Sequence, residues 1–350
     1  MEIIRPGTNI DFIGKRYIAY VLSGLILTII IVLLIWKGPN FGVDFTGGLL
    51  IQVRLDQQRT PDEIRKALQP VQLEDSIIQE FSEGGRLEYL IHTTKTDIDM
   101  QGLHEKLEQA LAIEFGKNVE IRRVEMVGPK VGKDLRQKAL FAIYYTLLLL
   151  AIYISGRFEA KWLMSVVMAG SLALVVVIAS GFGVSITWLI VIATIVTLGL
   201  CCLLKLKYAF GAIVALIHDV MITVGAFVLT DREFSLSVVA AILTIIGFSL
   251  NDTIVIYDRI RENLKRVKKK SFAEIINISV NETLSRTILT SGTVFLVLVS
   301  LYFLGGSVIN DFAFAMLVGV ITGTYSTVYV ASPVILIWED VTVKSSKGKT

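Results

Sequence analysis

The sequence predicts a polytopic α-helical membrane protein that carries one extracytoplasmic α+β domain. Hydrophobic residues make up 53% of the 350 residues and charged residues only 19%, and the mean hydropathy is +0.66. A soluble protein contains roughly 25% charged residues, so much of this chain needs an apolar solvent. Apolar runs long enough to cross a bilayer, which takes about 20 residues, recur along the chain. One charged segment, residues 37–138, interrupts them.

The same composition excludes several classes of protein. A net charge of +3, without a basic arm or a zinc-ligand cluster, argues against a nucleic-acid-binding protein. The two cysteines, Cys201 and Cys202, are adjacent within an apolar run, which excludes a disulfide framework and a CxxC redox site. Neither cysteine is expected to be reactive.

Eight apolar runs are candidate membrane spans. The first is too long for a cleavable signal peptide and lacks a small-residue cleavage site after it. The last is long enough to tilt or to end early at Pro333. The predicted spans are Tyr17–Trp36, Ala139–Ser155, Trp162–Phe182, Ile186–Leu204, Tyr208–Thr230, Leu236–Tyr257, Thr287–Leu304 and Phe312–Trp338.

The charged segment between the first two spans has the pattern of a ferredoxin-like domain. Its predicted order is β-α-β-β-α-β, which gives a four-stranded antiparallel sheet with two helices on one face. Thr60-Pro61 is a helix start, and leucines at i, i+4 spacing mark the second helix, which Gly116 ends. The strands are expected at Leu49–Leu55, Ser76–Phe81, Leu87–Thr94 and Val119–Val127, and the second helix at Asp99–Phe115.

The distribution of Lys and Arg predicts that both termini are cytoplasmic. Basic residues of short loops stay on the cytoplasmic side. With eight spans, every basic cluster falls on one side, and the short loops of the other side contain one Arg, Arg232. The largest cluster is Arg259–Lys270. Phe272–Ser285, which follows it, has apolar residues at helical spacing and is expected to lie along the inner interface.

Few charged residues fall inside the spans, and these are the candidate functional residues. A charge at the centre of a spanning helix costs ~2.5–3.5 kcal/mol on insertion scales, so it usually has a role and a partner. His218-Asp219 lies near the middle of its span, and Asn251-Asp252 and Arg286 lie at similar depth near the cytoplasmic end. Asp252 and Arg286 are therefore candidates for an ion pair that opens on protonation. The alternatives are a static pair that pins two helices together, or an Arg286 that reaches the interface.

No signature of an enzyme accompanies these residues. A nucleotide-binding loop, a GxSxG motif and an HExxH motif are all absent from the sequence. His92 and His104 lie in the outer domain and are expected at its surface. The sequence therefore predicts neither catalytic residues nor a metal or cofactor, and no ATP hydrolysis by this chain. Paired small residues such as Gly247 and Gly319–Gly323 are expected to allow close helix packing.

Five segments resemble the SecD/SecF family of the bacterial Sec preprotein translocase, and the layout of one domain followed by helices resembles its SecF branch. They are Phe41–Gly48 (FGVDFTGG), Ala215–Asp219 (ALIHD), Leu250–Asn263 (LNDTIVIYDRIREN), Leu284–Gly292 (LSRTILTSG) and Tyr329–Ser332 (YVAS). The resemblance covers nearly the whole chain. It implies an RND-like helix bundle, in which two such halves form a pseudo-symmetric pair.

The resemblance implies a function as well as a fold. The chain would pair with SecD in the bacterial inner membrane and use the proton gradient to promote polypeptide export. SecYEG, YajC, the exported polypeptide and membrane lipid would be its partners. The family's proton relay maps onto Asp219, Asp252 and Arg286, supported by His218 and Asn251. In FGVDFTGG, Gly42, Gly47 and Gly48 would form a structural turn, and Asp44 and Thr46 would hydrogen-bond within it.

Two other functions stay open from the sequence. One is half of an RND-type exporter of small molecules or lipids. Only about 100 residues lie between the first two spans of this chain, whereas drug exporters of the RND type have a much larger insert there. The other is a passive scaffold that holds other translocase components together. Mutation of the intramembrane charges would distinguish this scaffold from a proton-coupled subunit.

One segment departs from the family. Residues 160–207 add two spans to the usual six, and an even number leaves the later helices in their orientation. This segment lacks an HD pair and is expected to sit peripherally without carrying protons. The predicted organisation is therefore an N-terminus (1–16), a first helix (17–36), the outer domain (37–138), a second helix (139–159), an inserted hairpin (160–207), a four-helix core (208–338) and a cytoplasmic tail (339–350).

Overall fold

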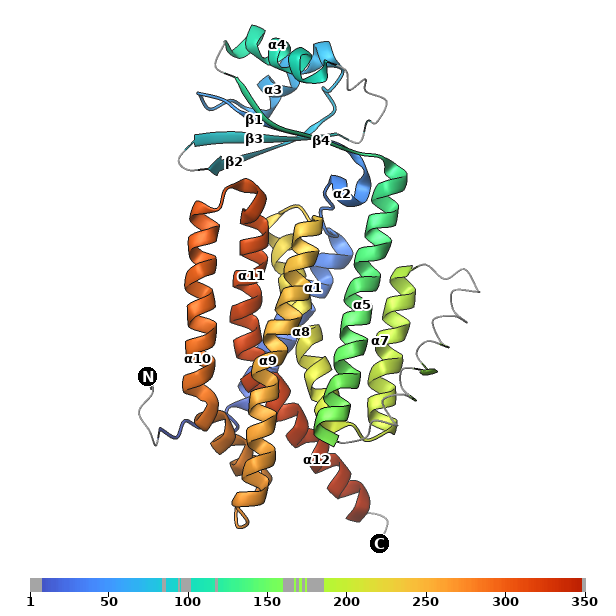
Figure 1. The fold of residues 1–350 in the computed structure, drawn as a ribbon, viewed down its shortest axis with the longest axis vertical. Helices are drawn as coiled ribbons and strands as arrows, with labels where there is room; N and C mark the ends of the chain where they lie inside the picture. Colours follow the sequence, from blue (N-terminus) through green and yellow to red (C-terminus); the bar gives the residue numbers. More distant parts are fainter. Residues whose placement is uncertain are drawn as a thin grey trace.

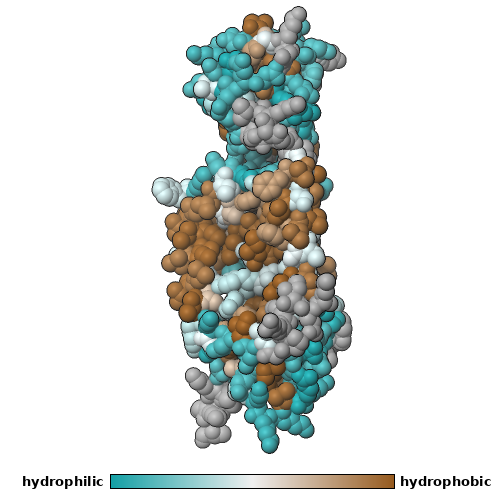
Figure 2. Space-filling model, turned by 90° about the vertical axis from the view of Figure 1, so that its left-hand side faces the viewer, coloured by the Kyte–Doolittle hydropathy of each residue, from teal (hydrophilic) through white to brown (hydrophobic). Residues whose placement is uncertain are grey.

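The computed structural model shows an elongated helix bundle with a small α/β domain at one end (Figure 1). It describes residues 8–83, 86–93, 95, 102–116, 119–159, 167, 170–171, 174 and 186–347. Within these residues, six helices are long and apolar enough to cross a membrane. Figure 2 shows the corresponding hydrophobic band on one face of the bundle, between a hydrophilic domain and a hydrophilic opposite end. The chain is therefore a multi-pass membrane protein.

Several helices of the bundle extend beyond the apolar runs that predict them. They are α1 (Arg16–Trp36), α5 (Pro129–Glu159), α7 (Ile186–Leu203), α8 (Lys207–Thr230), α9 (Leu236–Arg266), α10 (Phe272–Leu304), α11 (Ser307–Ser326) and α12 (Ser332–Lys347). Helix α5 starts ten residues before the predicted span and takes the end of the segment that we assigned to the outer domain. Hydropathy locates the apolar part of a helix but not its polar ends, and this explains the difference.

The segment Phe272–Ser285, which was expected along the inner interface, is not a separate helix. These residues form the first half of α10, which continues without a break to Leu304. The helix starts in a capping box, in which the Ser271 hydroxyl accepts a hydrogen bond from the Glu274 N–H and the Glu274 carboxylate accepts one from the Ser271 N–H. Since no proline occurs between Phe272 and Leu304, and a single glycine such as Gly292 is tolerated within a helix, one long helix forms.

The last predicted span is interrupted by one π-helical turn, Thr327–Ala331, which joins α11 to α12. The Ser332 N–H bonds the Thr327 carbonyl in the i→i+5 pattern, and the Ser332 hydroxyl donates to the same carbonyl at 2.8 Å. The chain therefore does not end its helix at Pro333. Single π turns of this kind occur often at functional sites.

The predicted inserted hairpin is only half visible. Its second helix, α7, contacts α5 and α8 at the edge of the bundle (Figure 1) and exposes Trp188 and Ile195. Most of the first predicted span, Trp162–Phe182, lies outside the described residues. The count of eight spans stays a prediction.

The α/β domain has the predicted element order. Its elements are β1 (Gly48–Arg54), α3 (Pro61–Ala67), a 3₁₀ turn (Gln69–Val71), β2 (Ile77–Glu83), β3 (Arg86–Thr93), α4 (Leu103–Phe115) and β4 (Glu120–Val127). The sheet order is β2-β3-β1-β4, and all three neighbouring pairs are antiparallel. Both helices cover the face that points away from the bundle (Figure 1).

The domain has a hydrophobic core of its own. Leu49, Ile51 and Val53 alternate along β1 and pack against Ile64 of α3 and Leu107 of α4. The predicted start of α3 is confirmed, because Thr60 and Glu63 form a complete capping box. The other face of the sheet carries polar residues and meets the ends of the membrane helices.

The FGVDFTGG segment connects the domain to the bundle as a short helix, α2 (Val43–Thr46), between α1 and β1. Gly47 has φ +73°, and a Cβ there would lie 2.7 Å from the Cα of Pro129 at the start of α5. Gly132 of α5 is similarly close to Gly47, because its Cβ would lie 2.9 Å from the Gly47 nitrogen. These glycines therefore let the turn pack directly on α5.

Candidate functional site

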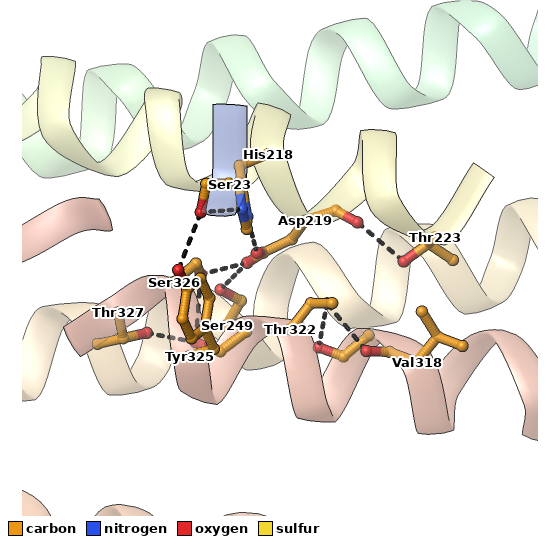
Figure 3. A network of polar contacts seen from close by, with 12 residues as sticks. Ser23, His218, Asp219, Thr223, Ser249, Val318, Thr322, Tyr325, Ser326 and Thr327 are labelled. Atoms are coloured by element: carbon orange, nitrogen blue, oxygen red, sulfur yellow. Dashed lines mark hydrogen bonds and ion pairs between the residues drawn. The ribbon is translucent and has the colours of Figure 1, made fainter. Parts of the chain in front are cut away.

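The buried polar residues of the bundle gather where α8, α9 and α11 meet, and these helices form most of its centre (Figure 3). Asp219 is the thirteenth residue of the 24-residue α8, and both it and His218 are buried. The predicted placement of the HD pair in the middle of a spanning helix is therefore what the structure shows. A buried carboxylate needs hydrogen-bond partners, and α9 and α11 supply them.

Two serines bind the same oxygen of Asp219. Ser249 of α9 donates to Oδ2 at 2.7 Å, and Ser326 of α11 donates to it at 2.8 Å (Figure 3). The other oxygen, Oδ1, lies 3.0 Å from Nδ1 of His218. Both carboxylate oxygens of Asp219 are therefore hydrogen-bonded, by groups from three helices.

His218 extends this network to α1. Its Nε2 lies 3.2 Å from Oγ of Ser23, which in turn lies 3.0 Å from the hydroxyl of Tyr325. Tyr325 donates to the carbonyl of Ala19 at 3.1 Å, and its ring stacks on the imidazole at 6.0 Å between centroids. Asp219, His218, Ser23 and Tyr325 thus form one continuous chain of groups that can exchange protons.

Asp252 lies in a second, smaller cluster on α9. It is buried, and the Ser291 hydroxyl of α10 lies 3.4 Å from its Oδ2, a long hydrogen bond. The Thr324 hydroxyl of α11 donates to Ser291 at 2.8 Å. Asp252 therefore has fewer hydrogen-bond donors than Asp219.

Helix α11 connects the two clusters through four consecutive polar residues, Thr324 to Thr327. Thr324 reaches the Asp252 cluster and Ser326 reaches Asp219, while Thr327 lies 3.3 Å from Thr253 of α9. The π-helical turn begins at Thr327. Both Asp219 and Asp252 are thereby linked to the end of α11, where the π-helical turn begins.

The predicted Asp252–Arg286 ion pair is not formed. Arg286 is exposed on the bundle surface, and its guanidinium lies more than 4.0 Å from every described carboxylate. Its attraction to Asp252 acts over a longer distance. The reason is helical periodicity: Thr287 and Ser291 share the buried face of α10 at i, i+4 spacing, and Arg286 lies about 100° away from Thr287. Asn251 likewise points outward from α9.

Among the outer residues singled out in the sequence, Asp44 and His92 are placed differently from the expectation. The Thr46 hydroxyl does donate within its turn, to the carbonyl of Gly42 at 3.1 Å. Asp44 instead accepts a hydrogen bond of 2.8 Å from the Leu236 N–H, at the start of α9. His104 is exposed, as expected, whereas His92 is buried. His92 lies on the polar face of the sheet, which the loop between α8 and α9 covers.

Sequence reasoning missed the hydroxyl groups of the site, namely Ser23, Ser249, Ser291, Thr324, Tyr325 and Ser326. One signal was Gly323, which we attributed to close helix packing. A Cβ on Gly323 would lie 3.0 Å from that of Ser249, so this glycine does allow the approach that brings Ser249 and Ser326 to one carboxylate. No cluster of three or more potential metal ligands occurs in the described part of the chain.

Comparisons with known proteins define the class of protein. The family model "Protein export membrane protein SecD/SecF, C-terminal" matches residues 107–202 and 184–341, and the "SecD/SecF GG Motif" model matches residues 32–58. The two stretches of the first match together cover more than half of the chain. This chain therefore belongs to the SecD/SecF family of protein export membrane proteins.

Its relatives place it with the SecF subunits of that family. "Protein translocase subunit SecF" of Magnetococcus marinus is 40% identical over 343 residues, which cover 97% of this chain and 95% of the relative. The protein of the same name from Desulfurispirillum indicum is 39% identical over 94% of this chain and 91% of its own length. Membership in this group supports a role in protein translocation.

Solved structures of SecDF share the fold. The crystal structure of SecDF from Thermus, described as a translocon-associated membrane protein, matches 95% of this chain with a TM-score of 0.69 and 29% identity. Its super-membrane-facing form matches 100% of this chain with a TM-score of 0.64. This chain spans 39% and 41% of the length of those two chains.

Proposed function

We propose that this chain is one half of a proton-driven protein export device and that SecD is the other half. The single observation that carries this proposal is the buried carboxylate pair, Asp219 and Asp252, joined through hydroxyl groups of α11. The SecDF chains are more than twice as long as this one, which matches 39–41% of their length. A SecD-like half would supply the remainder.

The chemistry of the site suits a relay better than a rigid brace. An ionised Asp219 accepts from two serines, whereas an Asp219 protonated on Oδ2 can donate, which changes its bond to at least one of them. One proton that moves down a potential of 100 mV releases ~2.3 kcal/mol. A differential free energy of this size shifts a two-state helix arrangement by more than tenfold.

Arg286 fits the same proposal through its exposure. A guanidinium is always charged and is costly to leave against lipid. Since the described residues of this chain place no carboxylate within 4.0 Å of it, we infer that an acid of SecD faces Arg286 across the subunit interface. SecYEG, YajC and exported polypeptide are further partners of the assembled pair.

The proposed topology has the outer domain on the extracytoplasmic side of the bacterial inner membrane. Both termini and the Arg259–Lys270 loop would then be cytoplasmic, as the positive-inside rule requires. The observed sheet order with two helices on one face supports a ferredoxin-like assignment for the domain.

Replacing Asp252 with Asn tests the relay. The change keeps the shape of the side chain and removes the proton site, so the variant should insert and bind SecD but lose the gradient-dependent increase in export. Asp258→Asn is the matched control, because Asp258 lies on the same helix in a half-exposed ion pair with Arg157. Export by Asp252→Asn at the parental rate, with the gradient present, would favour the scaffold function instead.

A further inference from the structure

The loop between α8 and α9 holds the outer domain by backbone hydrogen bonds. The Gly42 N–H donates to the Phe234 carbonyl at 3.1 Å, and the Phe234 N–H donates to the Asn40 carbonyl at 2.7 Å. Residues Phe41 and Phe234 also form a parallel β-bridge. This loop, residues 231–235, therefore joins the domain to the two helices that carry Asp219 and Asp252.

A buried acid and a buried base face each other at this junction. Oε1 of Glu233 lies 3.8 Å from Nδ1 of His92 on β3, and the two side chains are only 12% and 8% exposed. Nε2 of His92 is buried without a hydrogen-bond partner. The unsatisfied Nε2 makes a charged His92 costly here, and the 3.8 Å between Nδ1 and Oε1 is too long for a direct hydrogen bond, so the buried carboxyl of Glu233 has no donor on His92 while it is ionised.

The charges around Glu233 come from every element that packs against it. Asp311 of α11 and Asp44 of α2 repel a negative charge at Glu233, and Arg123 of β4 attracts it. Asp311 is itself paired with Arg232, the neighbour of Glu233 in the loop, and Arg123 is paired with Glu125 at 2.6 Å. The two attractive charges near Glu233 are therefore already engaged by other carboxylates.

We propose that Glu233 and His92 form a proton-binding site that couples the docking of the outer domain to the proton concentration on the side of the membrane where the domain lies. One proton, held on Glu233 beside a neutral His92, stabilises the docked domain. Loss of this proton leaves a carboxylate buried near Asp311 and Asp44 and weakens the junction. The loop then transmits the change to α8 and α9. This site is separate from the proposed relay and does not depend on it.

The contributions of Glu233 and His92 to docking change in opposite directions as the pH rises. Burial, with smaller contributions from Asp311 and Asp44, raises the pKa of Glu233 from 4.5 to about 7. Its contribution to docking is therefore complete below pH 4.5 and is lost as the pH rises through about 7. Burial lowers the pKa of His92 below 6.5, so its contribution is complete above 6.5 and is lost as the pH falls through the lowered pKa. Docking is consequently strongest in mildly acidic solution.

The first test measures the distance between the domain and the bundle in the full chain in lipid nanodiscs. Spin labels are attached at Ile113 of α4 and Leu304 of α10, which are 82% and 86% exposed, after replacement of both cysteines by serine. The parental distance distribution should be narrow at pH 6 and broaden as the pH rises through 7. Glu233→Gln, which is permanently neutral, should stay narrow at both pH values, and Glu80→Gln, an exposed glutamate of β2, should behave like the parent.

The second test measures the proton itself. Infrared difference spectroscopy of the same samples should show a protonated carboxyl band that loses half its intensity at about pH 7, and this band should be missing from Glu233→Gln. His92→Gln should shift its midpoint. The proposal is overturned if Glu233→Gln leaves the band unchanged. It is equally overturned if the parental distance does not change with pH, or if Glu233→Gln broadens with pH as the parent does.

Discussion

Ser326 of α11 donates a hydrogen bond of 2.8 Å to the same oxygen of Asp219 that accepts 2.7 Å from Ser249 of α9. One carboxylate oxygen of α8 is thus the point where three helices are joined by hydrogen bonds. An ionised carboxylate is only an acceptor, so both serines must donate to it. A proton on Oδ2 of Asp219 would reverse or break at least one of these bonds, and the packing of α8 against α11 would change with it.

Replacing Ser326 with Ala should therefore impair the gradient-dependent part of export. The ionised Asp219 loses one of two donors to Oδ2, and leaving a buried polar group unsatisfied costs about 1–3 kcal/mol. Export into vesicles, measured with and without an imposed proton gradient, checks this effect.

Ser300→Ala serves as the control for that measurement, because its hydroxyl bonds only the carbonyl of Leu296 in its own exposed turn. Ser249→Ala should resemble Ser326→Ala, since it removes the other donor. Parental gradient dependence in both serine variants would mean that the protonation of Asp219 has no part in export.

The sequence predicted the acids of the site but not its hydroxyl groups, and the reason is physical. Asp219 and Asp252 are conspicuous because a charge in a bilayer costs several times what a neutral polar group costs. Ser and Thr in a spanning helix can satisfy themselves on a carbonyl one turn back, as Thr223 does with Asp219. Nothing in the sequence distinguishes such a residue from Ser326, which reaches another helix.

The orientation of side chains around a helix explains why the predicted ion pair between Asp252 and Arg286 does not form. Equal depth suggested that Arg286 and Asp252 meet, but depth fixes only the position along the axis. Thr287 and Ser291 point into the bundle, so Arg286, one residue before Thr287, points to its surface. The buried polar pattern Thr283, Thr287, Ser291 was visible in the sequence and indicates this face of α10.

Gly319→Ala should destabilise the bundle. A Cβ at this position would lie 2.3 Å from side-chain atoms of Ile245 on α9, so the Ile245 side chain or one of the two helices must move. Overpacking of this kind costs about 1–3 kcal/mol. Thermal unfolding of the purified protein in detergent, followed by tryptophan fluorescence, should show a lower Tm than that of the parent.

Gly247→Ala is the matched control, because a Cβ added at this position of α9 would meet no neighbouring side chain or helix within 4 Å. This finding also corrects the expectation that Gly247 is a packing glycine. An equal loss of Tm in the two variants would show that the close approach of α9 and α11 does not matter for stability.

Single-cysteine labelling tests the topology. With Cys201 and Cys202 replaced, a cysteine at Lys268 should react only with reagent on the cytoplasmic side, because the basic residues Arg259–Lys270 hold that loop there. Lys268 is exposed just beyond the end of α9, opposite the outer domain (Figure 1). A cysteine at Gly183, between the two inserted spans predicted from the sequence, should react only from the other side.

The two positions together decide the span count. Labelling of both from one side would eliminate the inserted hairpin and leave six spans. Labelling of a cysteine at position 268 from the side of the outer domain would instead mean that the predicted orientation of the bundle in the membrane is reversed.

The outer domain, expressed as residues 38–137, should fold alone as a soluble monomer. Its core is closed within the segment, because the buried residues of β1, β3, α3 and α4 pack on one another without any bundle residue. The buried Tyr89 hydroxyl also finds both of its partners locally, on the N–H and carbonyl of Arg59. Circular dichroism and two-dimensional NMR should show a folded α/β chain with a cooperative thermal transition.

One buried and one exposed substitution in α4 distinguish a folded domain from a collapsed one. Leu107→Ala removes a fully buried side chain of α4 and should lower the free energy of unfolding by about 2–5 kcal/mol. Ile113→Ala, on the exposed face of the same helix, should change it by less than about 0.5 kcal/mol. A disordered parental fragment, or equal effects of the two substitutions, would mean that the domain needs the bundle and the α8–α9 loop to fold.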